Sequence, residues 1–158
     1  MFDRESWISL MPFIVVCFAA ASVGSFITNT SVNTWYAQLR KPDWTPPNWI
    51  FGPVWTTQYV LMAVSAWLVW RSTEWSVAKS ALILFGIQLA LNTLWSLLFF
   101  GLREVRLAFV EIMLLWMMVV ATVVSFLPLS RLAAWLLLPY LLWIGFASYL
   151  NFRIWQIN

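Results

Sequence analysis

Five long runs without charge constrain the fold of this chain more than any other feature of its sequence. They cover about residues 6–28, 47–70, 80–101, 107–126 and 132–152, and only Glu111 places a charge inside one of them. A helix needs roughly 20 residues to cross a hydrocarbon core of about 30 Å. Because the runs are continuously apolar and do not alternate with polar residues, they favour helices over a membrane β-barrel. We therefore expect an all-α membrane protein in which residues 1–158 form a single domain, a bundle of five transmembrane helices.

Composition supports a membrane protein and excludes several other classes. Of the 158 residues, 63% are hydrophobic and 9% are charged, whereas a soluble domain carries about 25% charged residues. The formal net charge of +3 is scattered between the apolar runs, so we expect no nucleic-acid partner. The chain has no histidine and one cysteine, Cys17, which excludes an intrachain disulfide, a Cys/His zinc site and a histidine-dependent triad. We expect no metal and no resident cofactor.

The segments between the runs predict the topology. An acidic and basic cluster, Asp3 to Glu5, precedes an apolar run too long for a removable signal peptide, so we expect the first helix to remain. The later connections are short, which is typical of antiparallel neighbours in an up-and-down bundle. Lysines and arginines are nearly balanced between the two ends of such a bundle, which leaves the orientation open.

The first connection, residues 29–46, is the longest. A short helix from Thr34 to Arg40, ended by Pro42, is expected within it, and Thr45 is a candidate N-cap for the second run. Long connections in compact folds are often functional. This segment is therefore either a lid over one end of the bundle or an ordinary loop at the membrane surface.

Three runs each place aromatic and polar or small residues on one helical face. Residues spaced by three or four positions share a face, which groups Trp55, Tyr59, Met62 and Ala66; Gln88, Asn92, Trp95 and Phe99; and Tyr140, Trp143, Ala147 and Asn151. Amides are costly in hydrocarbon unless they are hydrogen-bonded, so these faces should point into the bundle. Together they could line a pocket for a flat, apolar ligand.

Other features favour structural interpretations. Tryptophans at the ends of runs, such as Trp7, Trp70, Trp75 and Trp155, are typical interfacial anchors. Pro53 and Pro139 each remove a helical hydrogen bond and are expected to kink their spans. Glu111 lies only about one turn inside its run, which favours a carboxylate that reaches the headgroups.

Pairs of small residues offer possible helix contacts. Gly86 and Ala90 form a small-xxx-small step opposite the Gln88 face, and Ala20 and Gly24 form a similar step in the first run. Such steps let helix backbones approach closely. A homodimer through the Gly86 and Ala90 face is one possible use.

Three segments together resemble a known family. They are WYAQLRKPDWTPPNWIFGPVW from Trp35 to Trp55, QLALNTLW from Gln88 to Trp95, and PYLLWIGFASYLNF from Pro139 to Phe152. They resemble the translocator protein family, also called tryptophan-rich sensory protein or peripheral-type benzodiazepine receptor. The resemblance extends from the first loop to the C-terminus and implies a five-helix fold. It also implies an integral membrane protein, which we expect in a bacterial cell membrane.

The resemblance implies a pocket, capped by the first loop, that binds porphyrins such as protoporphyrin IX, benzodiazepine-site compounds and sterols. The ligand-binding residues carried over by position are Tyr36, Pro46, Trp55, Tyr59, Asn92, Trp95, Trp143 and Ala147. In vertebrate members a cholesterol-recognition tyrosine and basic residue end the last helix, whereas Phe152 and Gln156 stand at those positions here. This departure disfavours tight sterol binding and favours a tetrapyrrole-related role.

The resemblance, together with these features, implies three candidate functions. The first is a receptor or carrier for porphyrins and other hydrophobic molecules, linked to tetrapyrrole handling and stress signalling. The second is light-dependent oxidative degradation of a bound porphyrin, with Trp55 and Trp143 as candidate catalytic residues, since an excited macrocycle held against indoles in a dry site can react by electron transfer. The third is a structural or partner-binding protein in the lipid bilayer whose tryptophans only anchor helices.

Overall fold

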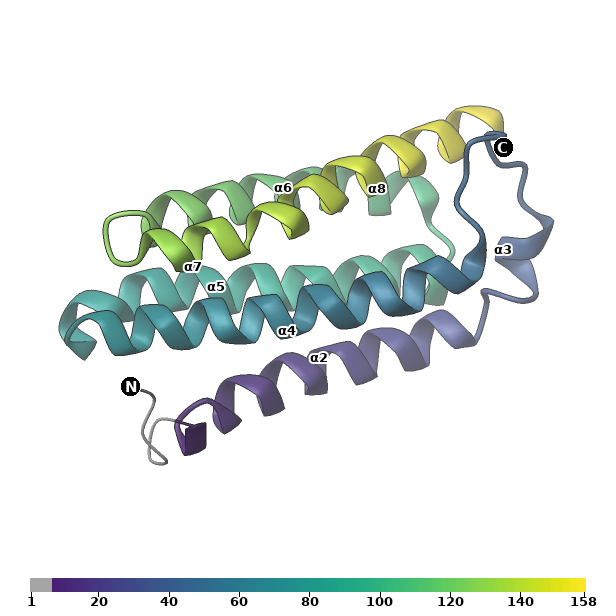
Figure 1. The fold of residues 1–158 in the computed structure, drawn as a ribbon. Coiled ribbons are helices and arrows are strands. Elements are labelled where there is room, and N and C mark those ends of the chain that lie inside the picture. The colour runs from purple at the N-terminus through teal and green to yellow at the C-terminus, as the bar shows by residue number, and fades with distance from the viewer. Residues whose placement is uncertain (1–6) are drawn as a thin grey trace.

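A computed structural model describes residues 7–158, and every regular element in this part of the chain is a helix (Figure 1). The elements are α2 Met11–Asn29, α3 Trp35–Gln38, α4 Asn48–Ser72, α5 Trp75–Ser96, the π-helix η1 Leu97–Gly101, α6 Val105–Phe126, α7 Arg131–Leu136 and α8 Leu138–Ile157. The long helices lie side by side along one axis. The all-α prediction is thus confirmed for the described residues, and Ser6, the expected start of the first span, lies outside them.

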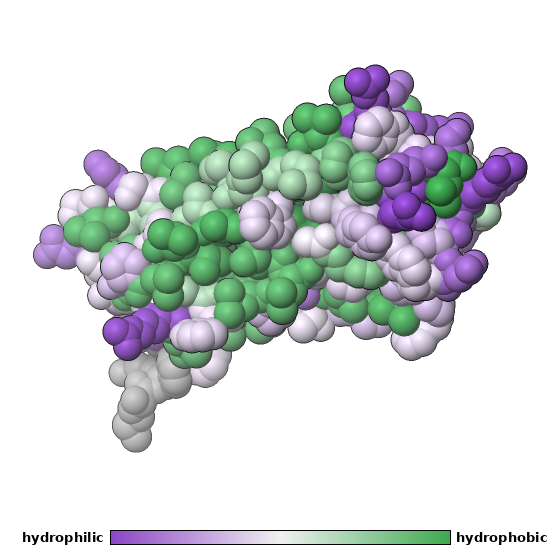
Figure 2. Space-filling view, turned by 90° about the horizontal axis from the view of Figure 1, so that it is seen from above, coloured by the Kyte–Doolittle hydropathy of each residue, from purple (hydrophilic) through white to green (hydrophobic). Residues whose placement is uncertain are grey.

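Four stretches of the described chain are long and apolar enough to cross a membrane: Met11–Asn29, Trp75–Gly101, Val105–Phe126 and Arg131–Ile157. Helix α4 has 25 residues, so its length of roughly 37 Å is sufficient. Thr56, Thr57 and Gln58 interrupt its apolar sequence and make it more polar than the other four. In Figure 2 hydrophobic residues form a broad central band between two hydrophilic ends, as in an integral membrane protein.

The two interrupting prolines behave differently. Pro53 lies inside α4, and the Thr57 hydroxyl donates a hydrogen bond of 2.9 Å to its carbonyl oxygen. Pro139 does not kink a continuous helix as expected. The helix ends at Leu136 and restarts at Leu138, so Pro139 stands in the first turn of α8, where no backbone donor is needed.

Small residues bring α2 against α5. Gly24 is buried, and a methyl group at its Cα would lie 3.3 Å from Ser96 Oγ, which is a tight contact. The Ala20 and Gly24 step therefore serves packing within the protomer. At the other end of α2, Trp67 Nε1 on α4 donates to Ser9 Oγ at 3.0 Å, and Phe13 packs against Trp70 with ring centroids 6.0 Å apart.

Glu111 lies inside the bundle, contrary to the expectation that it reaches the headgroups. Its side chain is 7% exposed, and neither carboxylate oxygen has a hydrogen-bond partner within the described residues. Ala108, Ile112 and Leu115, on the same face of α6, are fully buried. Depth along the run suggested an interfacial position, but that face packs into the bundle and keeps the carboxyl group away from the surface.

Replacing Glu111 with leucine is expected to stabilise the fold. The change removes a buried polar group without a partner, and such groups destabilise by about 1–3 kcal/mol. Unfolding in detergent micelles should show this gain for Glu111→Leu and little change for Glu111→Gln, which keeps a polar group in place. A lower free energy of unfolding for the leucine variant would mean that the carboxyl group has a stabilising partner.

Candidate functional site

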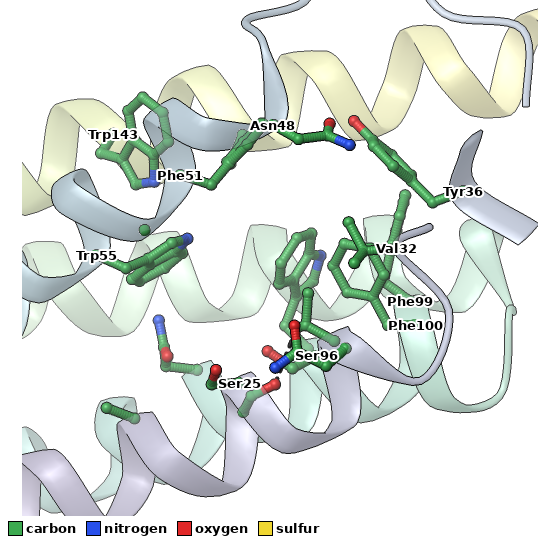
Figure 3. Close-up of a pocket in the computed structure, with 18 of the residues that line it drawn as sticks. Ser25, Val32, Tyr36, Asn48, Phe51, Trp55, Ser96, Phe99, Phe100 and Trp143 are labelled. Atoms are coloured by element: carbon green, nitrogen blue, oxygen red, sulfur yellow. Dashed lines mark hydrogen bonds between the residues drawn. The ribbon is translucent and has the colours of Figure 1, made fainter. Parts of the chain in front are cut away.

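A cavity of about 540 Å³ lies inside the bundle at the end covered by α3 (Figure 3). Its walls come from α2, the loop that contains α3, the N-terminal half of α4, the end of α5 with η1, and α8. The residues around it are Phe18, Ala21, Gly24, Ser25, Thr28, Asn29, Val32, Asn33, Tyr36, Asn48, Trp49, Phe51, Gly52, Trp55, Thr56, Tyr59, Asn92, Trp95, Ser96, Phe99, Phe100, Trp143, Ala147, Leu150, Asn151 and Ile154. Its size suits a drug-sized or cofactor-sized ligand.

The structure brings most of the sequence-predicted site residues to this cavity. Seven of the eight line it: Tyr36, Trp55, Tyr59, Asn92, Trp95, Trp143 and Ala147. Pro46 does not, because the lining resumes after it, at Asn48 in the first turn of α4. The three polar and aromatic helix faces do point inward, and their contact with a ligand stays a prediction.

Aromatic rings form the walls of the cavity. Trp55 packs against Tyr59 with ring centroids 5.8 Å apart, and Trp95 stacks on Phe99 at 5.2 Å with an interplanar angle of 25°. The π-helical turn η1 presents Phe99 and Phe100 to the cavity, and such turns often occur at functional sites. Flat indole and phenyl surfaces on several sides can stack on a planar guest.

Trp143 offers a hydrogen-bond donor that the protein itself does not use. Its indole Nε1 is buried and has no partner in the described part of the chain. Figure 3 shows this nitrogen directed toward Trp55 across the cavity. An indole N–H can only donate, and a buried donor without an acceptor is destabilising. A ligand acceptor in the cavity would satisfy it.

A chain of buried hydrogen bonds supports the cavity from the centre of the bundle. The Tyr59 hydroxyl donates to Asn92 Oδ1 at 2.6 Å, and Asn92 Nδ2 donates to the Tyr140 hydroxyl at 3.0 Å. These bonds join α4, α5 and α8 through one amide. An asparagine amide has two N–H groups, so the second remains for a ligand or water.

A second amide fixes the position of Trp95. Trp95 Nε1 donates to Asn151 Oδ1 at 3.1 Å, and Asn151 Nδ2 donates to the Val105 carbonyl oxygen at 2.9 Å. Asn151 is 1% exposed. The ring orientation of Trp95 is therefore held by a buried bridge between α5, α8 and the start of α6.

The first loop covers the cavity and is tied to the bundle at several points. The Ser31 hydroxyl donates to the Phe100 carbonyl oxygen at 2.7 Å. The Arg40 backbone and the Asn158 side chain exchange two hydrogen bonds, each 2.9 Å long. Trp44 stacks on Tyr149 at 5.3 Å with an interplanar angle of 8°. The loop thus covers one end of the bundle, and we call it the lid for this position; its opening and closing stay a prediction. Its helix, Trp35–Gln38, is shorter than expected.

Tyr36 and Lys41 form the inner edge of the lid. Lys41 Nζ donates to the Tyr36 carbonyl oxygen at 2.7 Å and lies 4.6 Å from the centre of the Tyr36 ring. Burial raises the pKa of Tyr36 to about 12, so its phenol faces the cavity as a neutral donor and acceptor at physiological pH. Partial burial also lowers the pKa of Lys41 below its usual value.

The sequence did not point to the α2 side of the cavity. Ser25, Thr28 and Asn29 line it, yet they end a long apolar run in which no polar stripe stands out. Asn48 and Gly52 also line the cavity and were not predicted, whereas Pro46 was carried over by position from the family resemblance. Only the packing of α2 against α5 shows which side of α2 faces inward.

The lining predicts what the cavity can hold. None of its described residues carries an acidic or basic side chain, so it offers stacking, apolar contact and neutral hydrogen bonds. A charged group on a ligand would have to lie at the mouth or be neutral, because an unpaired charge is unfavourable in such a site. This chemistry suits recognition of a flat, largely apolar molecule.

Comparison with known proteins places the chain among membrane proteins of one type. A sequence profile described as the TspO/MBR family matches residues 13–156. The chain is 44% identical to the tryptophan-rich protein TspO of Archaeoglobus fulgidus, with 96% of this chain and 97% of the relative covered. It is 42% identical to the protein of the same name from Chlorobaculum tepidum, over 92% of each chain. The chain is 39% identical to the translocator protein of Homo sapiens, over 96% of this chain and 91% of that one.

Proposed function

The chain belongs to the TspO/MBR family, and from that premise we propose that it is a membrane receptor or carrier for porphyrins and other flat hydrophobic molecules. The observation that carries the proposal is the uncharged cavity walled by Trp55, Trp95 and Trp143 from three helices. Benzodiazepine-site compounds and, more weakly, sterols fit the same description. A role in tetrapyrrole handling and stress signalling follows from porphyrin as the ligand, and a bacterial cell membrane is the proposed location.

We further propose that α4 crosses the membrane as a fifth span. Gln58, Tyr59, Ser65 and Trp67 on this helix are buried, and Ser65 Oγ donates to the Ala133 carbonyl oxygen at 2.7 Å. A helix whose polar groups are covered by other parts of the protein needs less hydrophobicity than one surrounded by lipid. The lid and the cavity then lie at one membrane surface.

Filling the cavity tests the proposed function. Purified protein titrated with protoporphyrin IX should show saturable binding, followed by the change in porphyrin absorbance against empty micelles. Ala147→Phe places a ring in the cavity and is expected to weaken binding about tenfold or more, a loss of roughly 1.4 kcal/mol or more. Leu142→Phe adds a ring to the exposed side of the same helix and should bind as the original chain does. Equal affinities for both variants, or no saturable binding at all, would favour a purely structural role.

Light-dependent degradation of the bound porphyrin is the second candidate function. Trp55 and Trp143 both border the cavity, so a bound macrocycle would lie against either indole. Illuminated protein should convert the porphyrin to a new absorbing species faster than illuminated micelles do. At saturating porphyrin, where a change in affinity does not contribute, Trp55→Phe and Trp143→Phe should slow the conversion. Equal rates with and without protein would reject this activity.

We propose a homodimer through α5 as the resting assembly. Gly86 and Ala90 are exposed on the protomer, and the space around Gly86 is open to 4 Å. Close approach of two helices at such a step depends on the missing side chain. Gly86→Leu is therefore expected to shift the protein from dimer to monomer in size-exclusion chromatography with light scattering. This interface would be contradicted if the unsubstituted protein were a monomer or if Gly86→Leu remained a dimer.

A further inference from the structure

Helices α2 and α4 contact each other mainly at the end away from the lid. There Phe13 packs against Trp70 and Phe18 against Tyr59, with ring centroids 6.0 and 6.5 Å apart. Just before α2, Ser9 Oγ accepts a hydrogen bond of 3.0 Å from Trp67 Nε1 on α4. Toward the lid, α2 packs against α5, where Gly24 lies close to Ser96, and Ser31, just after α2, donates to the Phe100 carbonyl oxygen on η1. Figure 3 shows the cavity between Ser25 on α2 and Trp55 on α4. The two helices are thus separated where the cavity lies.

Both edges of this separation are exposed, and both line the cavity. Asn48, Gly52 and Thr56 follow one another at four-residue intervals on α4, and Ser25 and Asn29 do so on α2. These five residues are small or polar, unlike the apolar side chains that normally face lipid. A Cβ atom added at Gly52 would meet nothing within 4 Å. The cavity therefore has a side opening, which we call the portal and define by these five residues.

By contrast, the lid closes the route into the cavity from the end of the bundle. The lid is fastened to η1 through Ser31, to the end of α8 through Arg40 and Asn158, and to the side of α8 through Trp44. Entry by that route requires at least the last two ties to break together. Entry through the portal requires none of them to break.

Resting on the proposed function, we propose that the ligand enters sideways from the bilayer through the portal, and that its class is a membrane-dissolved amphiphile. Asn48 and Thr56 are eight residues apart, so the opening extends roughly 12 Å along α4 from its first turn. That depth corresponds to the boundary between headgroups and acyl chains. An amphiphile at this boundary can slide its ring system inward while its polar edge hydrogen-bonds to the portal amides and hydroxyls.

The test measures rates with the full chain in lipid vesicles. Protoporphyrin IX is first partitioned into phosphatidylcholine vesicles, which are then fused with vesicles that contain the protein, and binding is followed by porphyrin fluorescence. Gly52→Trp fills the portal and should slow association by about tenfold. Val60→Trp, two turns further along the same exposed stripe of α4 and outside the lining, is the matched control. Gly52→Leu provides a milder version if the tryptophan variant folds poorly.

A second variant in the same experiment loosens the lid. Trp44→Ala removes the stack on Tyr149 and should leave the association rate unchanged. Faster association in this variant, or unchanged rates in both Gly52 variants while Val60→Trp also binds normally, would overturn the portal and assign entry to the lid. Absence of equilibrium binding by the original chain would instead reject the proposed function, and with it the portal as a ligand route.

Discussion

Asn92→Leu is expected to lower the free energy of unfolding by about 2–5 kcal/mol, because it leaves two buried tyrosine hydroxyls without their shared partner. Tyr59 is 6% exposed and Tyr140 is fully buried, and both hydrogen bonds pass through the Asn92 amide. Leucine has nearly the same volume, so the change removes the polar bridge and leaves no large cavity. Denaturant unfolding in mild detergent, followed by near-ultraviolet circular dichroism, measures the loss.

The chain contains a matched control one helical turn away. Gln88 is also a buried amide on α5, at 1% exposure, but its Oε1 has no partner in the described residues, and its Nε2 reaches only Met62 Sδ at 3.7 Å. Gln88→Leu should therefore be neutral or stabilising. If Gln88→Leu lowered the free energy of unfolding as much as Asn92→Leu, the destabilisation would be general to this helix face and would not arise from the tyrosine bridge.

The second large effect is expected on ligand affinity. Replacing Trp55, Trp95 and Trp143 together with alanine should weaken protoporphyrin IX binding roughly 10- to 1,000-fold, since each lost ring contact contributes about 0.5–1.5 kcal/mol beyond its area. Binding is read from the porphyrin absorbance, because the variant lacks three of the intrinsic fluorophores. Circular dichroism checks that the variant remains helical.

Three tryptophans at the opposite end of the bundle provide the comparison. Trp70, Trp75 and Trp135 are exposed and lie outside the cavity lining. Their triple alanine variant removes the same number of indoles and should bind with unchanged affinity. If both triple variants lost the same affinity for protoporphyrin IX, the porphyrin would bind on the general hydrophobic surface, and this would contradict a dedicated cavity.

Helical spacing predicted the inward faces because each contains a polar group that must avoid lipid. Asn92 and Asn151, for example, identify their faces without any structural information, and both prove to be buried and hydrogen-bonded. The cavity side of α2 gave no such signal, since its serine and threonine hydroxyls can bond to carbonyl oxygens of their own helix, as Thr28 does to Gly24. Which part of α2 faces inward depends on the contact between Gly24 and Ser96, which is a tertiary property.

Position along a run was also insufficient to predict the burial of Glu111. The sequence fixes how far the residue lies from the end of its helix, whereas burial depends on which neighbours cover its face. Leu115 and Ala108 on that face are both fully buried, and only the packing of the assembled bundle shows that this face is covered. Pro46 lies outside the lining, which resumes two residues later at Asn48 in the first turn of α4, and its contact with a ligand stays a prediction.

A structure of the protein with protoporphyrin IX bound tests the central claim most directly. The account predicts the macrocycle inside the bundle, between Trp55, Trp95 and Trp143 and beneath Tyr36, with an acceptor close to the Trp143 Nε1. The surface groove between α6 and α8, lined by Phe109, Trp116 and Tyr149 among others, offers aromatic contacts of its own. A porphyrin found in that groove, with the internal cavity empty or collapsed, would contradict the account.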